Sequence, residues 1–344
     1  MGHSRPAFRR SNRFADLQPT PVFDTYWRFA AERQAIFFRR LEGRKAPWTD
    51  DPILARHRFT NAYRATDRVS QFLIREVVYG EGRSDAANEV VFRVLMFKLF
   101  NKIETWNLLE EQLGQLRWET FDYKAYDLVL TEAMQRGGKL YSAAYIIPPV
   151  RWKDGDGVKH RGHLRLVREA LGGGLTDAIE AAMSLADVFI LLKKMPSFGD
   201  FLAFQLAIDI NYSTVIDFAE DSFVVAGPGA RDGIAKCFVN YSDYEPEDII
   251  EFMCDQQERE FSRLDLDFKT LWGRPLQLID CQNLFCEISK YARVAHPEIP
   301  GVSGRTRIKQ IFKPAGLPFP VWLPPKWGLN KQLHNWSART PQLL

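Results

Sequence analysis

The 344-residue sequence lacks the features that mark several common classes of protein. No apolar run approaches the roughly 18 residues of a transmembrane helix, and the basic start, MGHSRPAFRRSNRF, has no apolar core like that of a secretory signal. The cysteines form no C-x-x-C pair, which disfavours a zinc knuckle or a disulfide framework. We therefore expect a cytoplasmic protein without a membrane span, metal site or cofactor. We also expect reduced, mostly buried thiols at Cys237, Cys254, Cys281 and Cys286.

Signals for β-strands are also scarce. The best is the short apolar run at residues 223–225, which is ambiguous, whereas apolar residues recur with helical spacing through most of the chain. Hydrophobic residues make up 46% of the sequence, enough for a large core in one domain or two lobes. The pattern predicts an all-α fold. Helices are expected over residues 20–41, 59–78, 86–113, 123–135, 163–171, 176–194, 201–210, 233–239, 246–261 and 278–294.

Basic residues concentrate at the two ends of the chain. Residues 1–64 hold 13 Lys and Arg against 6 Asp and Glu, and residues 301–344 hold 7 against none. Residues 65–300, between them, hold 26 Lys and Arg against 37 Asp and Glu. Such ends indicate either arms that bind a polyanion or loosely ordered, solvated tails. The expected organisation is a basic N-terminal arm at 1–20, an all-helical catalytic domain at 21–313 and a basic tail rich in proline and tryptophan at 314–344.

The stretch LKKMPSFGDFLA, residues 192–203, is the most informative segment. One helix ends, Pro196 and Gly199 shape a tight turn, and a second helix begins at once. Unpaired backbone N–H groups at the start of that second helix suit a phosphate oxygen, so the turn would position a nucleic-acid backbone. The alternative is an ordinary corner between two helices. The residues expected to contact DNA here are Lys193, Lys194, Ser197, Phe198 and Gly199.

A glycine-rich stretch, AGPGARDGI, follows at residues 226–234. It is not a dinucleotide fingerprint, because Gly233 falls one place too late and no β-α-β unit surrounds it. Two interpretations stay open: a helix start that binds a phosphate, or a glycine-rich junction needed for close helix packing. The first interpretation places Gly227, Gly229 and Arg231 at the DNA, together with Arg305 and Arg307 of the basic C-terminal region.

Two polar clusters could line a pocket for a base. The segment FTNAYRATDR, residues 59–68, offers Asn61, Tyr63 and Asp67 as hydrogen-bonding and stacking groups. On the expected helix at 278–294, three polar residues share one face at positions i, i+4 and i+8. They are Asn283, Glu287 and Tyr291. The alternatives for both clusters are a solvated face or a buried structural network.

The 192–203 segment resembles the hairpin of helix-hairpin-helix DNA glycosylases. The resemblance implies a two-lobed helical fold and a catalytic aspartate about twenty residues beyond Gly199, where this chain has Asp217 and Asp221. Phe201 stands where that family's bifunctional members carry a lysine, so the resemblance implies a monofunctional enzyme in which Asp221, or secondly Asp217, assists water. Ser197 replaces the first glycine of the pattern. The matching positions are Leu192, Met195, Pro196, Gly199 and Ala203.

A wider resemblance covers roughly residues 59–312. The motifs FTNAYRATDR, FRVLMFKLFN, PSFGDFLAFQL, GPGARDGI and DCQNLFCEISKY, in this order, resemble the DNA-base hypermodification family of alpha-glutamyl/putrescinyl thymine pyrophosphorylases and the helical domain of 5-hydroxymethyluracil DNA kinases. The resemblance implies a glycosylase-like helical fold. It does not extend to kinase activity, because the sequence has no G-x-x-x-x-G-K-[ST] loop.

These resemblances favour a monomeric DNA glycosylase that flips out and excises a hypermodified pyrimidine, leaving an abasic site, in defence against phage. Its partner would be DNA carrying modified bases. Two alternatives stay open: a transferase that replaces a pyrophosphate on a 5-methyl-pyrimidine with an amine, and a non-catalytic reader of modified DNA. For a transferase, which works on the far side of the base, Asn61, Asp67 and Glu287 would matter more than Asp221.

Overall fold

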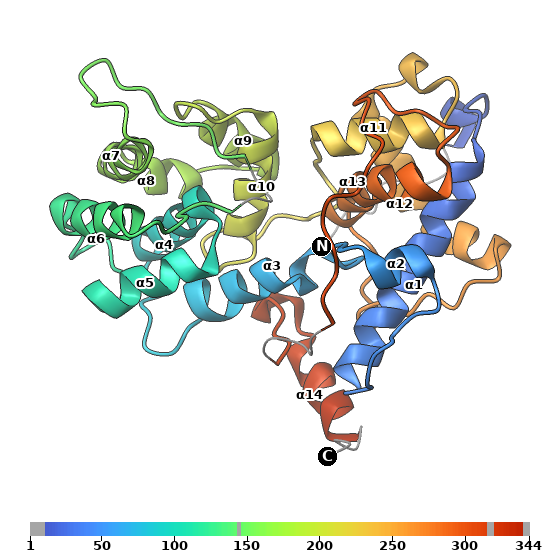
Figure 1. Ribbon diagram of the computed structural model, residues 1–344, viewed down its shortest axis with the longest axis horizontal. Helices are drawn as coiled ribbons and strands as arrows, with labels where there is room; N and C mark the ends of the chain where they lie inside the picture. Colours follow the sequence, from blue (N-terminus) through green and yellow to red (C-terminus); the bar gives the residue numbers. More distant parts are fainter. Residues whose placement is uncertain (1–10, 143–145, 315–319, 340–344) are drawn as a thin grey trace. The chain divides into compact units, whose positions relative to one another are not determined.

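The computed structural model describes residues 11–142, 146–314 and 320–339. Within these ranges the chain is helical, and the only β-type pairings are isolated bridges such as Pro19 with Phe238 (Figure 1). The all-α prediction is therefore confirmed for the described residues, and residues 223–225 form no strand. Residues 1–10 of the expected basic arm, and 315–319 and 340–344 of the expected tail, lie outside the described residues.

The chain divides into two compact units, each built from separate stretches of sequence. Unit 1 comprises Met1–Asp67, Glu220–Val321 and Gly328–Leu344. Its helices are η2 (Ser11–Phe14), α1 (Pro21–Leu41), α2 (Pro52–Arg56), η3 (Arg64–Thr66), α11 (Pro228–Cys237), η5 (Tyr241–Asp243), α12 (Pro246–Arg263), α13 (Leu278–Ala295) and α14 (Asn330–Arg339).

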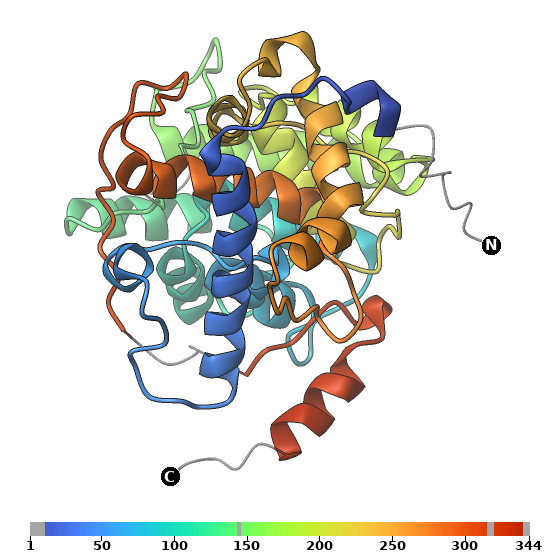
Figure 2. The same cartoon turned by 90° about the vertical axis from the view of Figure 1, so that its right-hand side faces the viewer.

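Helix α1 begins where local chemistry predicts. The Thr20 hydroxyl accepts a hydrogen bond from the Val22 N–H, and Pro21 occupies the first turn, where no N–H is needed. Its buried face packs against α12 and α13 (Figure 2). The Tyr26 ring lies 4.9 Å from Trp27 and 4.8 Å from Phe285 between ring centres. This aromatic cluster forms the core of unit 1 and holds α13 in place.

Unit 2 comprises Arg68–Ala219 and Trp322–Trp327. Helix α4 is its centre: from Glu89 to Phe100 every residue is buried, and α5, α7, α8 and α10 pack around it. Its helices are α3 (Arg68–Phe72), the π-helix η4 (Leu73–Val78), α4 (Ala87–Phe100), α5 (Ile103–Leu113), α6 (Tyr123–Gln135), α7 (Lys159–Gly172), α8 (Leu175–Glu180), α9 (Leu185–Lys193), α10 (Asp200–Asn211) and η6 (Pro325–Trp327).

Three of the expected long helices are broken, so these predictions were wrong in extent. The 86–113 helix stops at Asn101, which takes a left-handed conformation (φ 48°) between α4 and α5. The 176–194 helix is split into α8 and α9, and Ser184 caps the second part by accepting from the Asp187 N–H. The 59–78 helix starts only at Arg68, because the backbone before it is bound by carboxylates from α13.

Both ends of the described chain contact the body. Phe14 stacks on Tyr244, with 5.2 Å between ring centres, and Leu17 is buried. Near the other end, the Trp322 N–H donates to Gln71 over 2.8 Å, and both belong to unit 2. Among the described residues, no helix is both long enough and apolar enough to span a bilayer.

Candidate functional site

The expected hairpin is present in unit 2 as α9, a short turn and α10 (Figure 1). Gly199 is the N-cap of α10, and Ala203 is fully buried where the helices meet. Ser197 has a φ of 66°, a region that favours glycine, which explains why the resembling hairpins carry glycine there. Its hydroxyl donates to the Pro149 carbonyl over 3.0 Å. The turn is therefore anchored to a neighbouring loop.

The hairpin also carries exposed charge. The ammonium of Lys193 lies 2.6 Å from the Asp200 carboxylate, so that charge is partly balanced, whereas Lys194 is exposed without an ion pair among the described residues. The Phe198 side chain is buried and does not face solvent. Phe198, one of the five residues expected to contact DNA, therefore supports the turn from inside the protein.

Neither Asp217 nor Asp221, the two aspartates expected to be catalytic, is buried. Both are exposed, Asp217 belongs to unit 2 and Asp221 to unit 1. Asp217 lies 3.2 Å from the Lys326 ammonium. The buried acid of this stretch is Glu220, which pairs with the Arg274 guanidinium at 3.1 Å. The distance in sequence from the hairpin could not identify Glu220, since its burial depends on contacts with residues far along the chain.

The glycine-rich stretch serves close packing of α11 on α13. A Cβ atom added to Gly233 would lie 2.0 Å from the Phe285 carbonyl oxygen, and one added to Gly229 would lie 3.0 Å from the Cys286 sulfur. Gly227 is the N-cap of α11, and the Arg231 side chain turns back to the Ala226 carbonyl at 3.1 Å. These contacts agree with the packing interpretation of the motif.

The other two predicted DNA contacts lie in the exposed loop after α13. Arg305 and Arg307 are both exposed, and the Arg307 carbonyl accepts from the Arg293 guanidinium over 3.2 Å. Their own guanidinium groups form no ion pair among the described residues.

The two polar clusters predicted for base binding do meet in unit 1. Two acids of α13 bind the backbone of the 59–67 segment: Glu287 accepts from the Thr60 N–H at 2.9 Å, and Asp280 accepts from the Arg64 N–H at 2.7 Å. Asn283 between them donates to the Thr60 hydroxyl over 2.9 Å. Spaced at i, i+3 and i+7, these side chains share one face of α13 and determine the path of the segment.

Beside this contact, α1 contributes a buried arginine that sequence reasoning missed. Arg33 donates to the Thr60 carbonyl and to the Asn61 side-chain oxygen, each over 2.8 Å. Burial lowers its pKa to about 10, so the guanidinium keeps its charge at neutral pH. We call Arg33, Asn61, Asp67 and Glu287 the acid–arginine cluster. In the sequence, Arg33 could have been recognised only as a charged residue on the aromatic face of the helix that became α1.

Asp67 is the chemically distinctive member of the acid–arginine cluster. Its Oδ1 accepts from the Asn61 N–H at 2.8 Å, and the residue is half-buried. Burial raises the pKa of its carboxyl to about 7; the Asn61 N–H opposes that shift and the Glu287 charge adds to it. A carboxylate that gains and loses its proton near neutral pH is suited to general base catalysis.

The hydroxyl groups of the two tyrosines predicted for base binding, Tyr63 and Tyr291, bind other partners. The Tyr63 hydroxyl donates to the Arg274 carbonyl over 2.6 Å, and its side chain is buried. The Tyr291 hydroxyl donates to the Asp51 carboxylate over 2.6 Å, one turn beyond Glu287 on α13. Burial and the Asp51 charge both raise the pKa of Tyr291. Neither hydroxyl reaches the acid–arginine cluster.

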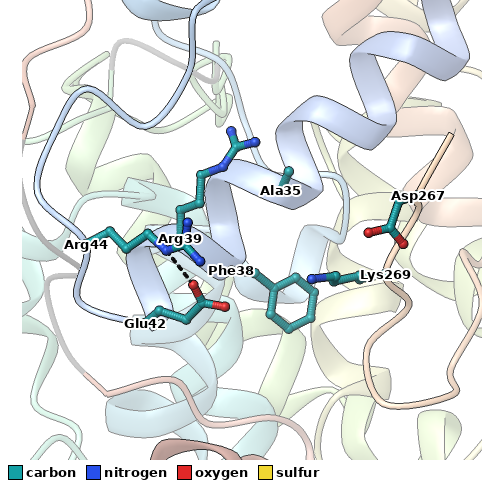
Figure 3. A pocket seen from close by; sticks show the side chains of 7 residues that line it. All are labelled: Ala35, Phe38, Arg39, Glu42, Arg44, Asp267 and Lys269. Atoms are coloured by element: carbon teal, nitrogen blue, oxygen red, sulfur yellow. Dashed lines mark ion pairs between the residues drawn. The ribbon is translucent and has the colours of Figure 1, made fainter. Parts of the chain in front are cut away.

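Tyr291 instead lines a groove of about 750 Å³ along α1 and the loop after it. Arg28 and Lys45 contribute exposed charges to this groove that have no ion pair among the described residues. A smaller cavity of about 210 Å³ shares Arg39 and Arg44 with it. Figure 3 shows the ion pair between Arg44 and Glu42 on one side of this cavity, and the side chains of Asp267 and Lys269, which also line it, on the other. The groove has the size of a small-molecule site.

Comparison with known proteins decides the family. The profile of the family described as "5-hmdU DNA kinase, helical domain" matches residues 20–301, which is most of the chain. The chain belongs to this family. A 5-hmdU DNA kinase of Bacillus phage SP10 is 27% identical over 288 residues, covering 78% of this chain and 45% of that protein. The chain thus spans a little less than half the length of this relative. No solved structure matches it.

The expectation of a DNA glycosylase is wrong. Both the family and the phage relative are named for a kinase of a base in DNA. Such a reaction adds a group to the base and leaves the bond between base and sugar intact, so it needs no carboxylate beside the sugar. The expected excision, the abasic product and the role in defence are overturned. The catalytic roles expected of Asp221 and Asp217 stay predictions.

Proposed function

We propose that this chain acts on 5-hydroxymethyluracil in DNA, as a transferase at the hydroxymethyl group of that base. The observation that supports this most is the family match over residues 20–301. The matched range contains all four residues of the acid–arginine cluster. An added group at the base's 5-position calls for a general base beside that position, and Asp67 has the pKa and the partial exposure for this task.

In the proposed reaction, Asp67 prepares the nucleophile. The hydroxymethyl oxygen attacks the terminal phosphorus of a nucleoside triphosphate, the O–H proton passes to the Asp67 carboxylate, and the bond from that phosphorus to the oxygen of the leaving nucleoside diphosphate breaks. Arg33 keeps its positive charge beside the carboxylate, and Glu287 holds the Thr60 backbone that carries the site. Positioning and charge stabilisation account for most of the rate of phosphoryl transfer in general.

A second candidate is the replacement of a pyrophosphate on the modified base by an amine. The observation that favours it is the absence of a G-x-x-x-x-G-K-[ST] loop from the 344 residues. In that reaction Asp67 would take a proton from the attacking amine. The two candidates differ in their substrate: a free hydroxymethyl group with a nucleotide, or a pyrophosphorylated base with an amine.

The test uses duplexes that carry thymine, 5-hydroxymethyluracil or its pyrophosphorylated form at one position. After incubation with a nucleotide and Mg²⁺, or with an amine, the DNA is digested to nucleosides and analysed by mass spectrometry. A phosphate gained only by the 5-hydroxymethyluracil duplex supports phosphoryl transfer, and an amine gained only by the pyrophosphorylated duplex supports the second candidate. If no duplex gains a group in any combination, both candidate reactions are refuted.

Asp67→Asn is expected to lower kcat/KM at least about 100-fold, because the amide cannot accept the proton. The fold should persist, since the amide oxygen can still accept from the Asn61 N–H. In the wild type the rate should rise with pH through about 7, as the Asp67 carboxyl ionises, and the variant should lack this inflection. The control is Glu258→Gln, an exposed acid of α12. Equal pH profiles for wild type and Asp67→Asn would remove Asp67 from the mechanism.

DNA binding is expected to weaken steeply as salt rises, because each Lys or Arg contact with a phosphate releases counterions. Replacing both Lys193 and Lys194 by Glu should lower the affinity and reduce the slope of log K against log salt by about 2. Fluorescence anisotropy at several salt concentrations measures this. Lys124→Glu, an exposed lysine of α6 in the same unit, serves as the control. A slope unchanged by the double variant would exclude the hairpin from the DNA contact.

A further inference from the structure

The loop before α7 in unit 2 is hydrogen-bonded to the hairpin. Its Pro149 carbonyl accepts from the Ser197 hydroxyl over 3.0 Å, and its Pro148 carbonyl accepts from His163 Nε2 over 2.9 Å. Burial lowers the pKa of His163 to about 4, so the ring is neutral and this contact persists at ordinary pH. Further along, the Trp152 indole donates to the Gly162 carbonyl over 3.0 Å. These hydrogen bonds connect the loop to the hairpin and to α7.

This loop carries an apolar side chain that is exposed to solvent. Ile146 is 86% exposed, while its neighbour Ile147 is 4% exposed and Val150 is 5% exposed. The two buried residues anchor the loop, and the alternation turns Ile146 outward. A single exposed apolar residue is ordinary on a protein surface. What distinguishes Ile146 is that the loop that carries it is hydrogen-bonded through Pro149 to a turn suited to phosphate, and that its β-branched side chain is stiff.

Both the loop and the hairpin carry exposed positive charge. Arg151 and Lys153 of the loop, and Lys194 of the hairpin, are exposed and have no ion pair among the described residues. The nearby acids are occupied: Asp154 lies 2.6 Å from Arg165, and Asp156 pairs with Arg161. The loop and the hairpin thus each carry exposed cations without an ion pair among the described residues, and the loop also carries an exposed isoleucine. A surface that binds phosphates and inserts an apolar side chain between bases has this composition.

We propose that Ile146 is a wedge: it inserts between base pairs of DNA bound at the hairpin and keeps the stack open while the modified base leaves the helix. Arg151, Lys153 and Lys194 bind the phosphates on either side of the opened step. The proposal rests on the proposed function, since a group at the 5-position of a stacked base must leave the duplex to enter an enclosed site. The wedge itself reads no sequence and recognises no modification.

The test measures unstacking separately from chemistry. A duplex carries 5-hydroxymethyluracil with 2-aminopurine as its neighbour, and the rise of 2-aminopurine fluorescence at saturating protein reports the opened stack. Ile146→Ala should reduce this rise several-fold while anisotropy shows nearly unchanged affinity. Ile146→Leu should keep most of the rise, because the apolar volume remains. Met183→Ala is the matched control, since Met183 is also 86% exposed in unit 2.

Each outcome decides between the proposals. If Ile146→Ala opens the stack and transfers the group as the wild type does, the wedge is wrong and the proposed function stands. If the wild type opens the stack, Ile146→Ala does not, and no group is transferred to any duplex, the wedge stands and the proposed function is wrong. Equal losses in Ile146→Ala and Met183→Ala, or a wild type that leaves the fluorescence unchanged, also overturn the wedge.

Discussion

Lys98→Met is expected to lower the free energy of unfolding by about 3–5 kcal/mol, because it leaves the Asp209 carboxylate buried without its main countercharge. The ammonium of Lys98 and the Asp209 carboxylate lie 2.7 Å apart, and their side chains are 3% and 4% exposed. They join α4 to α10, the second helix of the hairpin. Urea denaturation measures the change as a lower midpoint with an unchanged slope.

Two controls separate the buried charge from lost packing. The double variant Lys98→Met/Asp209→Leu should recover most of the lost stability, since an apolar pair can replace a buried ion pair at little cost. Arg136→Met removes an exposed partner of Glu132, so it should change stability by less than about 1 kcal/mol. If Lys98→Met were as mild as Arg136→Met, the pair would not be the support of the hairpin described above.

Gly233→Ala is expected to cost about 3 kcal/mol, because the new Cβ would lie 2.0 Å from the Phe285 carbonyl oxygen and 2.8 Å from its carbon. The obstacle is backbone of α13, so α11 must move away, and no side chain can turn aside to relieve the contact. Thermal and urea unfolding of the purified variant test this expectation.

Gly172→Ala is the matched control for this change. Gly172 ends α7, and a Cβ added there meets no atom within 4 Å. Alanine has the better helix propensity by about 1 kcal/mol, so this variant should be neutral or slightly stabilised. A Gly233→Ala variant as stable as Gly172→Ala would contradict the close packing of α11 on α13.

Elements with strong local signals were predicted well. Helix α6 runs over the expected residues 123–135, because Asp122 caps its first N–H groups and Gly137 follows its end. The hairpin between α9 and α10 was recognised from its proline, its glycine and the apolar residues around them. In each case the residues that start or end a helix lie directly beside it in the sequence.

The 59–67 segment was mispredicted for the opposite reason. Its apolar spacing favours a helix, but its N–H groups bind Glu287 and Asp280 more than two hundred positions away. A local pattern cannot reveal that competition, because an N–H bound to a distant carboxylate is unavailable to a helical carbonyl. The same distant contacts bind Glu287 and Asn283, two polar residues predicted at a base, to Thr60 of this segment.

The sequence by itself determined the all-helical fold, the hairpin and the residue types near the site, since helical spacing, caps and turn residues act over a few positions. Only the tertiary structure decided which acids have a raised pKa. Asp67 and Asp221 are both ordinary aspartates in the sequence, but Asp221 is exposed, whereas burial raises the pKa of Asp67 to about 7, with the Glu287 charge adding to the shift and the Arg33 charge opposing it. Burial raises the pKa of Asp280 in the same way. Desolvation depends on what surrounds a side chain, and those neighbours come from distant parts of the chain.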